Sequence, residues 1–262
     1  MASARSAAAL LALALVVAGC STQSLGSLSS DPTPTGSLGE GSLKETSLAA
    51  QAWRKDPSNK KNGLTYARGL MALERSEEAV KVVEELAHRN PDDLELAAYL
   101  GKIMVQSGRL QDGEKQLRKA VAGGRDDWRI RSALGSALDQ QGRYQEARQC
   151  YEEALKRKPD EVSVINNLGM SYALEGDLKT AETHLRRAMG LPKGDDNAQL
   201  RQNLALVVGL QGRFQDAEAI ARGDLSPAEA QANVAYLRQM LAEQRQWKKN
   251  QRGSPLSPST GS

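Results

Sequence analysis

Hydrophobic and polar positions repeat along the chain with a period of 34 residues from residue 60 onward. The segments SGRL, QGRY and EGDL place Gly108, Gly142 and Gly176 34 residues apart, and Gly212 of QGRF follows after 36. Prolines recur on the same lattice, at Pro57, Pro91 and Pro159. A fixed period of this length predicts a solenoid of stacked structural repeats.

Two positions of every repeat hold only glycine or alanine. The first column, in the first predicted helix, is Ala67, Gly101, Gly135, Gly169 and Ala205. The second, in the second helix, is Ala79, Gly113, Ala147, Ala181 and Ala217. Because small residues let helix axes approach closely, this pattern predicts an all-α fold of five helix–turn–helix repeats over 60–93, 94–127, 128–161, 162–195 and 198–231.

The best repeat, 128–161, resembles the tetratricopeptide repeat (TPR). The matching residues are Leu134, Gly135, Leu138, Gly142, Ala147, Tyr151, Ala154 and Pro159. Arg131 occupies the position where the family pattern has tryptophan. The resemblance implies a TPR α-solenoid in which the first helix of each repeat lines an inner, concave surface.

Both ends of the array, which spans 44–231, are predicted to differ from the repeats. A lone helix over 47–55 would cover the first repeat, and a helix over 227–249 would cover the last, starting with a capping box at Ser226 and Glu229. One apolar stripe of this last helix should pack on the array: Ala230, Val234, Leu237 and Leu241. A second stripe, Tyr236, Met240 and Trp247, suits either further packing, which is favoured, or a partner contact. Residues 250–262 are predicted to be a disordered tail.

The N-terminus resembles that of a bacterial lipoprotein. Arg5 precedes an apolar run over 7–18, which is too short to span a membrane, and the run ends in VAGC. This pattern predicts a signal peptide over 1–19 and lipidation of Cys20, although a plain signal peptide with a chance cysteine would give it too. Residues 20–43 are rich in Ser, Thr, Gly and Pro and predict a flexible tether. Ser21 favours the periplasmic face of the outer membrane by resemblance, and no disulfide to Cys150 is expected.

Composition and charge narrow the range of functions. Hydrophobic residues make up 40% of the chain and aromatic residues only 4%, which suits closely packed helices. The net charge of +3 is too small and too evenly spread to indicate nucleic-acid binding. His88 and His184 lack neighbours at metal-ligand spacing. Without a phosphate loop or nucleophile motif, the chain is not expected to be an enzyme or to use a cofactor, a metal or a small-molecule substrate.

The expected activity is therefore binding of protein partners in the groove lined by the first helices. In the TPR family, certain positions of this helix, including the sixth, tend to face the groove. These positions give Arg68, Lys102, Arg129, Asn166, Asn167, Met170, Gln202, Asn203 and Leu206, and the same register adds Asp139. Asn167 and Asn203 share the sixth position, where an asparagine amide holds a peptide backbone in some TPR proteins. Ordinary surface usage explains these asparagines equally well.

The segment GDLSPAEAQANVAYLRQM, within 203–240, is not required by the repeat pattern. It resembles the end of the TadD family, the TPR lipoproteins of the tight-adherence (Tad/Flp) pilus system. That resemblance implies an outer-membrane lipoprotein that assists pilus assembly as a pilotin-like partner of the secretin. The alternative is another TPR lipoprotein adaptor of the envelope: a type IV pilus pilotin, an outer-membrane protein insertion subunit or a regulator of cell-wall enzymes.

Overall fold

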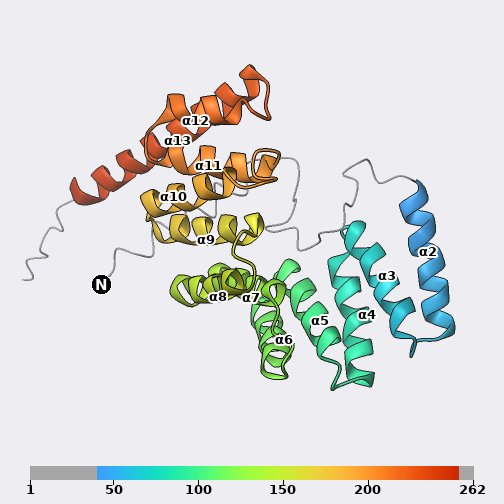
Figure 1. The fold of residues 1–262 in the computed structure, drawn as a ribbon. Coiled ribbons are helices and arrows are strands. Elements are labelled where there is room, and N and C mark those ends of the chain that lie inside the picture. Colours follow the sequence, from blue (N-terminus) through green and yellow to red (C-terminus); the bar gives the residue numbers. More distant parts are fainter. Residues whose placement is uncertain (1–39, 254–262) are drawn as a thin grey trace, which may run out of the picture. The chain divides into compact units, whose positions relative to one another are not determined.

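A computed structural model describes residues 40–253, and within them it contains twelve helices and no strand (Figure 1). The all-α fold is thus confirmed. The predicted signal peptide, Cys20 and most of the tether lie outside the described residues, as does the end of the tail. The first described helix begins at Glu40, and the last continues past 249 to Gly253.

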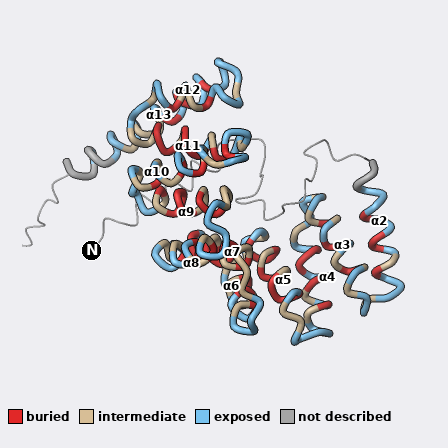
Figure 2. The backbone as a smooth tube through the Cα atoms, viewed as in Figure 1, coloured by how far each residue is buried: buried red, intermediate tan, exposed pale blue. Residues whose placement is uncertain are grey.

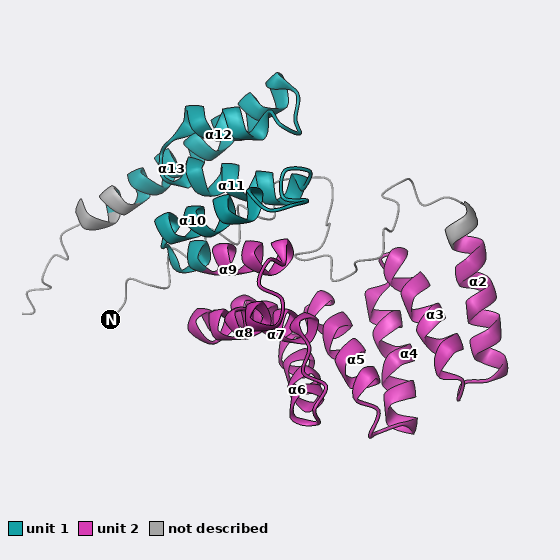
Figure 3. Ribbon diagram, viewed as in Figure 1, with its two compact units in different colours: residues 1–20, 172–262 teal, residues 21–171 magenta. Residues whose placement is uncertain are grey.

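The chain divides into two compact units (Figure 3). The described part of the N-terminal unit covers 40–171, and that of the C-terminal unit covers 172–253. The first contains α2 (Glu40–Lys55), α3 (Lys60–Ala72), α4 (Ser76–Arg89), α5 (Leu94–Gln106), α6 (Leu110–Ala122), α7 (Trp128–Gln140), α8 (Tyr144–Arg157) and most of α9 (Val162–Glu175). The second contains the end of α9, α10 (Leu178–Met189), α11 (Ala198–Leu210), α12 (Phe214–Ala221) and α13 (Pro227–Gly253).

The small residues lie where paired helices approach, and these inner positions are buried (Figure 2). A Cβ atom on Gly101 would lie 2.9 Å from the carbonyl oxygen of Gly113, and one on Gly113 would lie 2.8 Å from that of Gly101. A Cβ atom on Gly135 would lie 2.6 Å from the ring of Tyr151. Real side chains do not pack this closely, so glycine is what allows α5 to meet α6 and α7 to meet α8.

Local signals fix where the helices begin and turn. The side chains of Asn59, Asp93, Asp127 and Asn197 accept hydrogen bonds from backbone N–H groups at the starts of α3, α5, α7 and α11. The turn glycines take positive φ angles, from +75° at Gly142 to +103° at Gly176. This is the left-handed conformation expected where one helix must stop and the next begin.

The last helix covers the fifth repeat as expected. Ser226 and Glu229 form the predicted capping box, with the Ser226 N–H donating to Glu229 Oε2 at 2.9 Å. Ala230, Val234 and Leu237 of α13 are buried. Leu237 packs directly on Gly209 of α11, and α2 packs on α3 at the other end of the array.

Two glutamates join successive repeats through the turns. Glu114 of α6 accepts hydrogen bonds from Gln141 Nε2 at 2.9 Å and from Arg143 Nη1 at 2.8 Å. We call this group, with Arg118, the Glu114 cluster. Glu182 of α10 makes the equivalent contacts with Gln211 and Arg213, both at 2.8 Å. The turn motif QGR therefore supplies ion pairs as well as a turn, which the sequence analysis did not foresee.

Candidate protein-binding cleft

A cleft of about 220 Å³ opens on the N-terminal unit between α3, α5 and the start of α7. Its lining combines basic, acidic and apolar side chains: Leu64, Arg68, Glu95, Ala98, Tyr99, Lys102, Arg125, Asp127, Arg129 and Ile130. Three predicted groove residues, Arg68, Lys102 and Arg129, are thus brought together. Arg68 and Lys102 meet here because they occupy the same position of successive repeats.

The two acidic groups of the cleft are held by the protein itself. Glu95 accepts a hydrogen bond from Lys60 Nζ at 2.7 Å. Asp127 Oδ1 accepts hydrogen bonds from the backbone N–H groups of Arg129 at 2.8 Å and Ile130 at 3.1 Å, which caps α7. Their charges are therefore committed to helix packing and helix capping.

The basic side chains of the cleft have fewer polar contacts than the acidic ones. Lys102 is half-buried, and neither it nor Arg68 makes a hydrogen bond or ion pair within the described residues. Burial lowers the pKa of Lys102, and the charge of Arg129 acts in the same direction, against the opposing effect of Asp127. Arg129 stacks on Trp128 with its guanidinium carbon 4.5 Å from the ring centroid. Lys158 Nζ lies at the same distance from that ring.

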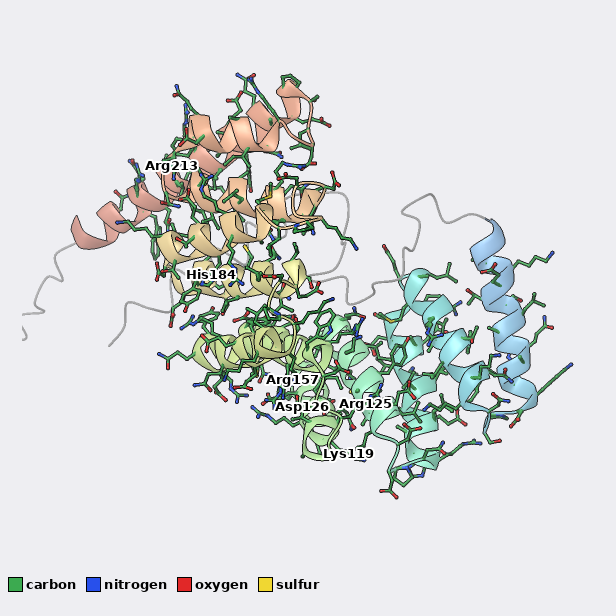
Figure 4. The ribbon with its side chains drawn as sticks, viewed as in Figure 1. Lys119, Arg125, Asp126, Arg157, His184 and Arg213 are labelled. Atoms are coloured by element: carbon green, nitrogen blue, oxygen red, sulfur yellow. The ribbon has the colours of Figure 1, made fainter. Side chains whose placement is uncertain are left out.

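Tyr99 and Arg125 are cleft residues that the sequence analysis missed. Tyr99 occupies the sixth position of its repeat. Because this position tends to face the groove in the TPR family, the sequence could have indicated Tyr99 as well as the asparagines. Tyr99 is half-buried, and burial raises the pKa of its hydroxyl. Arg125 lies in the connection before α7, outside the helical register, and no helix pattern could have placed it (Figure 4).

The predicted residues of α9 do not line this cleft. Asn167 Nδ2 donates to Ser132 Oγ of α7 at 3.4 Å, and Asn166 Nδ2 donates to Asn167 Oδ1 at 3.4 Å. Met170 is buried. Ser132 lies one helical turn from Arg129, so Asn167 is held beside the face of α7 that continues from the cleft.

The remaining candidates belong to the C-terminal unit. On α11, Gln202 is exposed and Leu206 is half-buried, whereas Asn203 is buried and accepts a hydrogen bond from Gln199 Nε2 at 3.2 Å. On α13, Tyr236 and Trp247 are exposed and Met240 is half-buried, so the further packing that was favoured for this second stripe is not seen for its two aromatic side chains.

Asp139, which the register also placed in the groove, lies between helices instead. It is buried and accepts hydrogen bonds from Tyr151 Oη of α8 at 2.9 Å and from Ser171 Oγ of α9 at 2.6 Å. Burial raises its pKa to about 7, although both hydroxyl groups oppose this shift. We call Asp139, Tyr151 and Ser171 the Asp139 junction.

A second hollow of about 360 Å³ on the N-terminal unit contains Cys150. The two arginines on its lining are paired: Arg118 Nε lies 2.8 Å from Glu114 Oε1, and Arg131 donates to both carboxylate oxygens of Asp126. Arg157 also donates to Asp126 (Figure 4). Arg131, which replaces the tryptophan of the repeat pattern, thus ties α7 to its own N-terminal connection.

The described residues contain no group of three or more His, Cys, Asp or Glu side chains suited to a metal ion. No helix among them is long and apolar enough to cross a membrane.

Comparisons with known proteins agree with this architecture. One tetratricopeptide repeat model matches residues 46–103 and another matches residues 132–197. Two separate segments of the chain are thus tetratricopeptide repeats, and proteins built from such repeats are in general scaffolds or adaptors. No curated protein sequence matches the chain.

Several solved structures share the fold. PilW, described as a widely conserved type IV pilus biogenesis factor, is 17% identical over 75% of this chain and 99% of its own, with a TM-score of 0.62. TTC0263, a thermophilic TPR protein of Thermus thermophilus, is 22% identical over 68% and 98%, with a TM-score of 0.58. YrrB, a TPR protein with an unusual peptide-binding site, is 13% identical over 74% and 99%, with a TM-score of 0.51. At these identities the likeness concerns the fold alone.

Proposed function

We propose that this protein is an adaptor that captures an extended segment of a partner protein in the cleft between α3, α5 and α7. The observation that carries the proposal is the cleft itself, in which Arg68, Lys102 and Arg129 come from three successive repeats. A groove crossing several repeats suits an extended chain better than a compact ligand. Peptide recognition by YrrB, a protein of the same fold, is consistent with this use.

The proposal includes an anchor at the membrane. Lipidated Cys20 would hold the protein at the periplasmic face of the outer membrane, and residues 20–43 would give the array reach. Each buried methylene of an acyl chain contributes about 0.8 kcal/mol, so several chains on one cysteine would anchor stably. Confinement to a membrane raises the effective concentration of the cleft near a partner in that membrane.

Within this class, we propose a role in Tad/Flp pilus assembly as a pilotin-like partner of the secretin. The support is the segment GDLSPAEAQANVAYLRQM, which includes the capping box and most of the stripe that seals the fifth repeat. A second candidate is a type IV pilus biogenesis factor, favoured by the structural likeness to PilW. Co-purification with a Tad secretin or with a type IV pilus secretin distinguishes the two.

Partner capture can be tested by affinity purification from native membranes followed by mass spectrometry. The variant Arg68→Ala/Lys102→Ala/Arg129→Ala should lose the secretin that the wild-type protein retains. The matched control, Lys61→Ala/Lys81→Ala/Lys115→Ala, removes three lysines outside the cleft and should retain it. If both variants retained the secretin equally, the cleft would not be the site of capture.

Anchoring needs a separate experiment. Cys20→Ser should move the protein from the outer-membrane fraction to the periplasm. If the variant still sediments with the outer membrane, the lipid anchor is wrong, whatever the outcome of the capture experiment.

A further inference from the structure

The last helix, α13, has two parts that differ in their surroundings. Its first part packs on the fifth repeat, where Ala230, Val234 and Leu237 are buried. Beyond Gln244, which is half-buried, every side chain that the structure describes is exposed. Figure 1 shows this end of the helix continuing past α11 and α12 of the same unit. The end of α13 therefore contributes little to packing of the array.

An apolar stripe runs along the outer face of this helix. Tyr236 is 42% exposed and Trp247 is 53% exposed, and the half-buried Met240 lies between them in sequence. Spacings of four and seven residues put the three side chains on one face of an α-helix, over a length of about 16 Å. No residue of α13 lines either of the two hollows described above. The stripe is thus a helix face rather than a pocket.

The charge of the chain changes sign toward the same end. Residues 20–243 contain 30 Lys and Arg against 32 Asp and Glu, a net side-chain charge of −2. Glu243 is the last acidic residue, and the segment after it has a net side-chain charge of +4 from Arg245, Lys248, Lys249 and Arg252. A basic helical segment with exposed aromatic residues is typical of helices that lie on a membrane surface.

An anionic phospholipid surface fits both the stripe and the charge. Tyr and Trp are favoured at the boundary between lipid and water, because each has an apolar ring and a hydrogen-bonding group. Lys and Arg are attracted to anionic headgroups over a Debye length of about 8 Å, which is comparable with the diameter of a helix. The attraction therefore does not require every cation to face the lipid.

We infer that the end of α13 docks on the surface of an anionic phospholipid membrane. Tyr236, Met240 and Trp247 lie in the headgroup region, and the cations after Glu243 stay near the lipid phosphates. The choice of lipid over an acidic protein surface rests on the proposed function, because an anchor at Cys20 would already hold the chain at a membrane. The contact is weak and reversible beside that anchor, and it restricts how the protein turns on its tether.

The first experiment removes the anchor, so that membrane binding depends on the protein surface alone. Residues 20–262 with Cys20→Ser are mixed with vesicles of phosphatidylglycerol and phosphatidylethanolamine in equal parts, or with vesicles of phosphatidylcholine, and co-sedimentation is measured. Affinity for the anionic vesicles should be at least about tenfold higher, because each cation near an anionic surface contributes to binding. Equal affinity for the two kinds of vesicle, or binding to neither, overturns the inference.

The second experiment assigns the contact to α13. In the same protein, Lys248→Gln/Lys249→Gln should weaken binding to the anionic vesicles about tenfold. The matched control Lys81→Gln/Lys115→Gln removes two exposed lysines of the N-terminal unit and should change the affinity by less than about twofold. If the two variants lose the same affinity, binding depends on net charge alone and the end of α13 is not the contact.

Tryptophan fluorescence tests the aromatic stripe. Trp53 is buried and Trp128 is half-buried, so Trp247 is the exposed tryptophan that contact with lipid should shield from water. The emission of the Cys20→Ser protein should therefore shift to shorter wavelength on anionic vesicles, and Trp247→Phe should lose this shift. A shift that persists in Trp247→Phe would show that Trp247 does not enter the headgroup region.

Failure of this inference and failure of the proposed function give different results. If neither kind of vesicle is bound but Tyr236→Ser/Trp247→Ser loses the secretin in affinity purification, the stripe contacts a protein and the membrane contact is wrong. Negative vesicle experiments leave partner capture and the lipid anchor standing. Those two are tested separately by the cleft variant and by fractionation of Cys20→Ser.

Discussion

Lys102 in the cleft and Asp139 in its junction are both driven toward their neutral forms by burial, but the protein treats them in opposite ways. Asp139 is closed off between α7, α8 and α9, and two hydroxyl groups donate to its carboxylate. Lys102 lines a cleft and has no hydrogen-bond partner in the described residues. The carboxylate of Asp139 is therefore hydrogen-bonded within the fold, whereas the ammonium group of Lys102 can still pair with a ligand.

The difference separates structural charge from binding charge in a protein with many charged residues. A buried polar group that is fully hydrogen-bonded contributes to the specificity of packing, and losing one of its partners is costly. A group without partners can be removed at little cost to stability, but at a cost to any ligand it binds. The Glu114 cluster lies between these extremes, since it is well paired but partly exposed. Stability and binding measurements on these three regions should therefore diverge.

The largest expected effect is at the Asp139 junction. Asp139→Ala leaves the hydroxyl groups of Tyr151 and Ser171 buried without their acceptor, which should lower the free energy of unfolding by about 3 kcal/mol. Asp139→Asn keeps an acceptor for one hydroxyl and a donor for the other, and should stay within about 1 kcal/mol of wild type at pH 7. Urea unfolding followed by circular dichroism measures both. Equal stability of the two variants would mean that the junction contributes nothing beyond packing.

The same carboxyl group should make stability depend on pH. Its folded pKa, about 7, lies above its ordinary value of 3.8, so the folded state binds more protons between these values. The stability of wild type relative to Asp139→Asn should therefore fall as pH rises from 4 to 7, with a total change on the order of 3 kcal/mol. Urea unfolding of both proteins across this pH range is the measurement. A difference that is constant with pH, or that increases, would contradict burial as the dominant influence on this group.

A smaller loss of stability is expected at the Glu114 cluster. Glu114→Ala removes the acceptor of Gln141, Arg143 and Arg118, and should cost about 1.5 kcal/mol. Glu152→Ala removes an exposed glutamate of the neighbouring helix and should change stability by less than about 0.5 kcal/mol. Thermal and urea unfolding of the pair should show this order. If the two variants had the same stability, the Glu114 cluster would contribute no more than ordinary exposed charges.

The smallest expected effect on stability is at Lys102. Lys102→Met removes a half-buried charge without a partner and should raise the free energy of unfolding at pH 7 by about 0.5 kcal/mol. The gain should shrink as pH rises toward 10.5, because the wild-type lysine then loses its charge in both states. The comparison protein is Lys115→Met, for which no gain is expected. A clear loss of stability in Lys102→Met would show that the lysine is structural, and the contrast with Asp139 would fail.

The sequence alone was sufficient for the repeat architecture, because the features that define it are local or steric. The 34-residue period, the Gly and Ala columns at Gly101 and Gly113, and the capping box at Ser226 each act through backbone geometry or through contacts inside one repeat. It also put Arg68 and Lys102 on one face, because repeats related by a fixed period present equivalent positions in the same direction.

Only the tertiary structure decided what each side chain meets. The repeat register predicted that Lys102 and Asp139 both face the groove. Lys102 does line a cleft, but Asp139 lies between helices with Tyr151 and Ser171. Arg125 reaches the cleft from a connection that has no helical register. Burial, hydrogen-bond satisfaction and hence charge depend on atoms contributed by neighbouring repeats, about 30 residues away along the chain. The repeat pattern indicates the direction in which a side chain points, but not how close it lies to the side chains of neighbouring repeats.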